Sequence, residues 1–76
     1  MNVWSYVFIT THTPKKVVQA IRSIPGVVKA DALFGTPDAI AIVEGSDIGS
    51  MDSVIDKIVE VDGVQGTDSK VARWID

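Results

Sequence analysis

The sequence predicts one α+β domain, with a four-stranded antiparallel sheet that carries two helices on one face. Its 76 residues suffice for a single domain. Apolar residues recur at the two-residue spacing of strands in some segments and at the helical spacing in others. The two halves of the chain also repeat one pattern of strand, helix, glycine and strand. Two such units in tandem give the order βαββαβ, which is the ferredoxin-like sandwich.

A shift of 37 residues relates the two halves. It aligns apolar residues and one glycine: Val17 with Val54, Val18 with Ile55, Ile21 with Ile58, Ile24 with Val61, Gly26 with Gly63, and Val27 with Val64. Solenoids need at least three copies, so two copies indicate a duplicated β-α-β unit. Right-handed crossovers then predict the strand order 4-1-3-2. The first and last strands lie side by side in that order, which predicts that Trp4 and Trp74 are neighbours.

The first half begins with a strand over residues 2–11, which are rich in β-branched and aromatic side chains. The polar residues that follow, Thr10 to Thr13, are expected to shape a loop and cap a helix. Thr13 suits the N-cap and Pro14 the first helical position. Pro25 and Gly26 end this helix. Its apolar stripe is Val17, Val18, Ala20, Ile21 and Ile24.

Two strands over residues 27–34 and 39–44 follow, joined by the turn Gly35-Thr36-Pro37-Asp38. The second helix is expected to be capped by Ser50 and to carry Asp52 in its first turn. Asp62 and Gly63 end it, and residues 64–75 form the last strand. The apolar stripe of this helix is Met51, Val54, Ile55, Ile58 and Val61.

Composition excludes several classes of function. The chain has no cysteine and one histidine, which rules out disulfides, thiolate catalysis and His-rich metal sites, so no metal or cofactor is expected. A net charge of −3, with Lys15 and Lys16 as its most basic stretch, argues against direct nucleic-acid binding. No apolar run approaches the roughly 20 residues of a membrane helix. The N-terminus lacks a signal-peptide pattern, so a cytoplasmic location without membrane contact is expected.

The first strand is apolar on both faces. Val3, Val7 and Ile9 alternate with the aromatic residues Trp4, Tyr6 and Phe8, and the third strand is likewise apolar on both sides. A monomer needs a polar outer face. We therefore expect a homodimer packed sheet to sheet, against the alternative that the aromatic residues form the rim of a monomer. The expected interface residues are Trp4, Tyr6, Phe8 and Trp74.

The chain resembles the effector domain of the Lrp/AsnC (feast/famine) family of transcriptional regulators. The resemblance covers residues 3–72 and is carried by YVFITT, VVQAIRSIPGVVKADALFGTPDAIAIVEGSD and VIDKIVEVDGVQGTDS. It implies a βαββαβ domain that dimerises through its sheet, assembles into larger rings such as octamers, and binds free amino acids. Full-length members also carry an N-terminal helix-turn-helix. This chain begins at Met1, almost directly on the first strand, so it is similar to the stand-alone members.

The resemblance also implies a ligand site at the Gly-x-x-Asp turn, which here is Gly35, Thr36, Pro37 and Asp38. The Asp38 carboxylate suits the ligand's ammonium group, and backbone N–H groups near Gly35 and Thr36 suit its carboxylate. The terminal Thr-x-Ser pattern, Thr67 and Ser69, would add hydroxyls. Many members carry an aromatic residue where this chain has Pro37. The structural alternative is an ordinary hairpin turn without a ligand.

Three functions follow from these observations. The first is a stand-alone amino-acid-binding regulatory domain that self-assembles and modulates full-length Lrp/AsnC regulators. The second is a purely structural oligomerisation module. The third is a small dimeric α+β barrel enzyme, which ranks lowest because the sequence shows no converging acid and base. A module of the ACT type shares the topology but lacks support, since no glycine loop follows Thr11.

Overall fold

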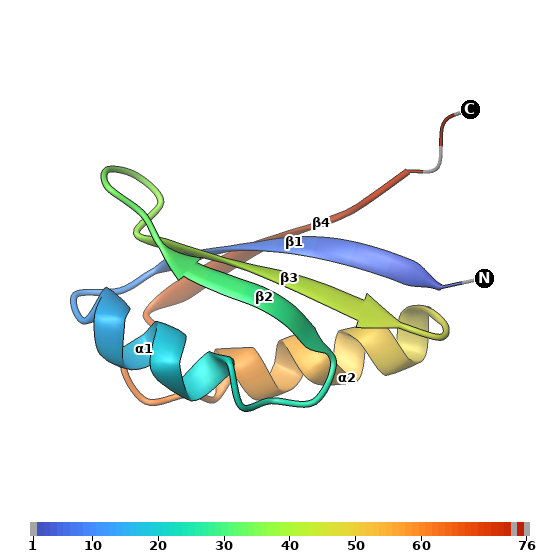
Figure 1. The fold of residues 1–76 in the computed structure, drawn as a ribbon, viewed down its shortest axis with the longest axis horizontal. Coiled ribbons are helices and arrows are strands. Elements are labelled where there is room, and N and C mark those ends of the chain that lie inside the picture. The colour runs from blue at the N-terminus through green and yellow to red at the C-terminus, as the bar shows by residue number, and fades with distance from the viewer. Residues whose placement is uncertain (1, 74, 76) are drawn as a thin grey trace.

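The computed structural model describes residues 2–73 and residue 75, and it forms a four-stranded antiparallel sheet with two helices (Figure 1). The sheet order is β2-β3-β1-β4, which confirms the predicted ferredoxin-like topology and strand order. Trp74, expected beside Trp4, lies outside the described residues. The elements are β1 (Val3–Thr10), α1 (Pro14–Ile21), β2 (Val27–Ala32), β3 (Ala39–Gly45), α2 (Ile48–Val59) and β4 (Gly66–Val71).

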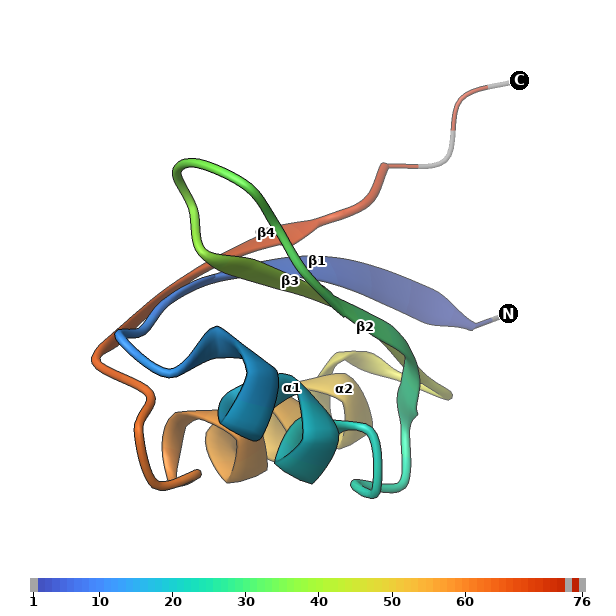
Figure 2. The same ribbon diagram turned by 60° about the vertical axis from the view of Figure 1, so that its left-hand side comes forward.

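Both helices cover the same face of the sheet, and the other face is open (Figures 1 and 2). The core lies between these two layers, and the predicted stripes supply most of it. Ala20 is the exception, because it is exposed. Neither helix in the described part of the chain is long and apolar enough to span a membrane. The largest fully buried apolar side chains are Ile9, Ile21, Ile58, Val7, Val17 and Val43.

The internal repeat is visible in the packing of two glycines. Gly26 and Gly63 follow the two helices and have φ angles of +99° and +100°, which favour glycine. A Cβ atom on Gly26 would lie 2.5 Å from Val54, and one on Gly63 would lie 3.0 Å from Val17. Val17 and Val54 are themselves related by the 37-residue shift. Each half therefore places its glycine against the equivalent valine of the other half.

Four elements are shorter than the sequence predicts. Strand β1 covers Val3–Thr10 instead of residues 2–11, and β2 ends at Ala32 instead of residue 34, so Leu33 and Phe34 belong to the turn. Helix α1 ends at Ile21, because the amides of Ser23 and Ile24 bond to carbonyls three residues back and tighten the chain into turns before Pro25. Strand β4 covers Gly66 to Val71 instead of residues 64–75. Single backbone bonds still flank this strand, from Gln65 to Thr10 and from Ala72 to Trp4.

The cap of α2 differs from the expected one. Asp47, not Ser50, is the N-cap: its extended backbone precedes Ile48, and its carboxylate accepts a hydrogen bond of 2.7 Å from the Ser50 amide. Ser50 is therefore inside the helix, and Asp52 lies beyond the first turn. Both predictions were wrong for the same reason, which is that α2 begins two residues before Ser50.

Substitution of Asp47 is expected to reveal a pH-dependent cap. The backbone N–H of Ser50 is the main cause that holds the pKa of Asp47 below its ordinary value of 3.8, and the Ser50 side chain adds to it. A lowered folded-state pKa stabilises the protein above the unfolded-state value, and the effect is lost as pH falls through the folded-state value. The variant D47A should therefore melt below the wild type at pH 7, with a smaller difference at pH 3. Asn caps without a charge, so D47N should retain most of its stability, and thermal unfolding followed by circular dichroism checks all three proteins.

Candidate functional site

Three connections meet at one end of the sheet, on the left of Figure 1. They are the β1–α1 loop, the α2–β4 connection and the turn between β2 and β3. This turn, residues 33–38, is called the hairpin arm below. In both views it rises from the sheet on the side away from the helices (Figures 1 and 2). The predicted ligand-binding turn is thus part of a projecting segment.

Asp38 fixes the base of the hairpin arm through its backbone and its side chain. Its amide donates to the Ile9 carbonyl at 3.1 Å, and its carbonyl accepts from the Leu33 amide at 2.8 Å. The carboxylate oxygen Oδ2 accepts from the Thr11 amide at 3.0 Å. Among the described residues, this is the one hydrogen bond to the half-buried carboxylate. Asp38 therefore has a structural contact and keeps a second oxygen, Oδ1, for another donor.

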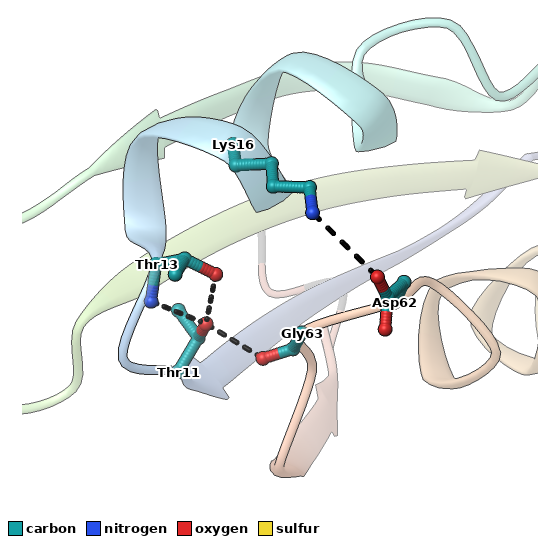
Figure 3. A network of polar contacts seen from close by, with 5 residues as sticks. All are labelled: Thr11, Thr13, Lys16, Asp62 and Gly63. Carbon is teal, nitrogen blue, oxygen red and sulfur yellow. Dashed lines mark hydrogen bonds and ion pairs between the residues drawn. The ribbon is translucent and has the colours of Figure 1, made fainter.

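Thr11 connects the hairpin arm to the ends of both helices, and Figure 3 shows its bonds at the helix ends. Its side chain is buried, and its hydroxyl donates to the Gly63 carbonyl at 2.6 Å while accepting from the Thr13 amide at 3.0 Å. An exposed ion pair of 3.6 Å between Lys16 and Asp62 lies beside this network. Loss of the Thr11 hydroxyl would leave two backbone groups without their partner, which is costly where they are buried. Thr13 is the N-cap residue of α1 as predicted, but its side chain makes no capping bond.

Gly35, Thr36 and Pro37 form the tip of the hairpin arm. Gly35 has a φ of +110° and open space around its Cα, and Thr36 is exposed. Their backbone N–H groups make no hydrogen bond to the described residues. Pro37 is half-buried and has no N–H to donate. The tip thus offers two free N–H groups, and one negatively charged side chain follows two residues after Thr36; a small ligand with a carboxylate and an ammonium group suits such a combination.

Thr67 and Ser69 do not join the hairpin arm within one chain. They pair with Ile9 and Val7, whose side chains are fully buried beneath the helices, so all four lie on the helix side of the sheet. The hairpin arm rises on the other side (Figure 2). Strand β1 also separates β4 from β3, a distance of about 10 Å across two strand spacings.

The side of the sheet without helices, called the open face below, is apolar in its centre. Trp4, Tyr6 and Phe8 on β1 lie opposite Glu44, Ile42 and Ile40 on β3. Trp4 is 39% exposed and Tyr6 is 42% exposed, as expected for side chains that none of the described elements covers. The two edge strands add charged pairs to this face: Lys29 with Asp31 at 3.5 Å on β2, and Lys70 with Asp68 at 3.3 Å on β4.

A shallow, open depression of about 350 Å³ lies at the opposite end of the sheet. It holds none of the predicted ligand-binding residues. Among the described residues, no group of three or more histidine, cysteine, aspartate or glutamate side chains is arranged to hold a metal ion. The depression is lined by Asn2, Gly26, Val27, Val28, Glu44, Gly45 and Ser46.

Comparison with known proteins extends these observations. The sequence model of the Lrp/AsnC ligand binding domain matches residues 5–72. No curated protein sequence gives a match. The crystal structure of TTHA0845 from Thermus thermophilus is similar, with a TM-score of 0.87, 24% identity, and coverage of 96% of this chain and 95% of that chain.

Two longer proteins solved with a ligand are also similar. The transcriptional regulator NMB0573 from Neisseria meningitidis, in complex with L-Met, has a TM-score of 0.79 and 18% identity, over 95% of this chain and 50% of that chain. The feast or famine regulatory protein Rv3291c from M. tuberculosis, complexed with L-methionine, has a TM-score of 0.75 and 16% identity, over 92% and 49%. At these identities the likeness concerns the fold, and this chain spans about half of each protein.

Proposed function

The chain belongs to the Lrp/AsnC ligand-binding domain family, and we propose that it is an effector domain that binds a free amino acid. The observation that carries the proposal is the tip of the hairpin arm, where two free backbone N–H groups lie close in sequence to the Asp38 carboxylate. The complexes of the Neisseria meningitidis and M. tuberculosis proteins with methionine support the same ligand class.

In the proposed site, Asp38 accepts a charge-assisted hydrogen bond from the ligand's ammonium group through Oδ1. The N–H groups of Gly35 and Thr36 hold the ligand's carboxylate. The ligand side chain meets no aromatic ring at position 37, because that residue is proline. Thr67 and Ser69 lie on the other side of their own sheet, so any hydroxyl they contribute comes from a second copy of the chain.

The proposal includes self-assembly and a regulatory partner. A homodimer forms sheet to sheet through Trp4, Tyr6, Phe8 and Trp74, and dimers gather into a larger ring. The assembly acts in the cytoplasm on full-length regulators of the family. Binding is favoured over catalysis because His12 lies exposed on a loop. One observation favours a competing function. The Asp38 carboxylate already accepts a hydrogen bond from the Thr11 amide, as it would in a structural oligomerisation module whose hairpin arm binds no ligand.

A thermal-shift panel of the twenty amino acids tests ligand binding. A ligand at 100 times its dissociation constant adds about 2.7 kcal/mol, and each kcal/mol moves the midpoint of a domain this size by roughly 4–8 °C. We expect one or a few amino acids to raise the wild-type midpoint. The variant D38N keeps an oxygen for the Thr11 amide but removes the negative charge, so it should fold and lose most of this shift.

The control is D62N, which removes a carboxylate from an exposed ion pair. It should keep the full ligand response. A flat panel with the wild type would favour the structural module. A full response in D38N would contradict the assigned role of Asp38 while leaving amino-acid binding in place.

A further inference from the structure

The most exposed aromatic side chain of the described residues lies on the hairpin arm. Phe34 is fully exposed, and its neighbour Leu33 is 39% exposed. The arm that carries them is fixed at its base by the hydrogen bonds of Asp38 to Leu33, Ile9 and Thr11. Phe34 is thus held out in water by an ordered support, and the burial of an aromatic ring is among the larger stabilising terms in an interface.

The hairpin arm continues the open face. On β2, Lys29 and Asp31 belong to the open face, and alternation places Leu33 on the same side. The arm itself rises on that side in both views (Figures 1 and 2). A second copy that covers the open face therefore comes within reach of the arm, and the arm of that copy reaches back by symmetry.

The size of the open face also supports a second copy of this chain as the partner that covers it. Four strands of six to eight residues give a flat face of about 450 Å², from spacings of 4.8 Å between strands and 3.3 Å along them. Each partner of a standard protein interface contributes about 800 Å². The flat area leaves out the relief of the side chains, so it is a lower bound on the accessible surface that a second copy would bury, and two apolar side chains on a projecting segment add to it.

Charge favours a second copy of this chain over a highly charged partner. Each edge strand carries one lysine and one aspartate on the open face. Arg22 of the α1 end also pairs with Asp31 at 3.4 Å, and Glu44 lies opposite Trp4, so these two residues add one charge of each sign and the charges balance. The apolar centre and the balanced edge charges complement an identical surface. A strongly basic or acidic partner would meet charges of both signs there and no net opposite charge.

We propose that the hairpin arm is a clasp: in the sheet-to-sheet dimer, the Phe34 ring of each copy packs against the other copy. This inference rests on the proposed dimer and adds the contact that stabilises it. The arm then serves two purposes, since Phe34 binds the second copy while the neighbouring Gly35, Thr36 and Asp38 face the ligand.

The test is the dimer dissociation constant measured by sedimentation equilibrium. F34A is expected to raise it at least tenfold, as for an interface aromatic residue cut back to alanine. The matched control is V59A, which shortens an exposed apolar residue on α2, on the far side of the sheet. It should leave the constant unchanged.

The mobility of a spin label gives a second measurement, in which Phe34 is not mutated. The chain has no cysteine, so T36C and Q19C each provide a unique site, on the hairpin arm and on α1. The label at position 36 should be immobilised in the dimer and become mobile on dilution. The label at position 19 should be equally mobile at both concentrations.

The outcomes separate this inference from the proposed function. A wild-type dimer that F34A leaves unchanged, with a label at position 36 that stays mobile, would overturn the clasp and leave the sheet dimer standing. A wild-type chain that is monomeric at every concentration would overturn both. An intact F34A dimer with weakened amino-acid binding would overturn the clasp and move Phe34 into the ligand site.

Discussion

The variant G45A is expected to be strongly destabilised, although alanine is the smallest possible change. Gly45 ends β3, and a Cβ atom there would lie 2.5 Å from the Met51 backbone nitrogen and 2.8 Å from the Met51 Cα. These atoms belong to a helix backbone, so no side-chain rotation relieves the contact. Overpacking typically costs about 1–3 kcal/mol, and we expect the upper end of that range. For a domain this size the midpoint of thermal unfolding should fall by roughly 10–20 °C.

The matched control is G49A, four residues later in the chain. Gly49 lies in the first turn of α2, and a Cβ atom there would meet only the Asp47 carboxylate at 3.5 Å. Alanine is also the better helix former by up to about 1 kcal/mol. G49A should therefore melt at or above the wild-type temperature. If G45A and G49A melt alike, α2 does not pack against β3 as closely as described.

The fold was predictable because its strongest signals are local and periodic. Residues such as Ile21 and Ile58 recur at helical spacing in both halves, and the 37-residue repeat fixes the element order. The strand order follows from crossover handedness. The cap of α2 was less predictable, since Ser46, Asp47 and Ser50 are all good N-cap residues. Three-dimensional packing decides where that helix begins.

The candidate site was predictable only in part. The turn from Gly35 to Asp38 is evident in the sequence, but the contact of Asp38 with the Thr11 amide joins residues 27 positions apart, and no periodicity marks it. The sequence placed Thr11 in a capping loop, and its hydroxyl bond to Gly63 depends on a separation of 52 residues. The separation of Thr67 from the hairpin arm likewise depends on which face of β4 carries it.

The variant Y6D is expected to abolish the proposed dimer without unfolding the chain. Tyr6 lies in the centre of the open face, and in a symmetric dimer both copies lose the ring and gain a carboxylate. Burial of each of the two tyrosines contributes about 2 kcal/mol to the free energy of dimerisation, and losing both contributions corresponds to a roughly thousandfold weaker dimer. Burying two charges would weaken the dimer further. The monomer should tolerate the change, because Lys70 lies directly opposite position 6 and pairs with an aspartate there.

The control V59D places the same charge on α2, at a residue that is 49% exposed on the far side of the sheet. Sedimentation equilibrium at micromolar concentrations should give a dimer for the wild type and V59D, and a monomer for Y6D. Circular dichroism checks that all three remain folded. A Y6D dimer of wild-type affinity would place the interface elsewhere. Trp4, Tyr6 and Phe8 would then be rim residues outside the interface. A folded Y6D monomer that binds no amino acid would indicate that the ligand site needs two copies.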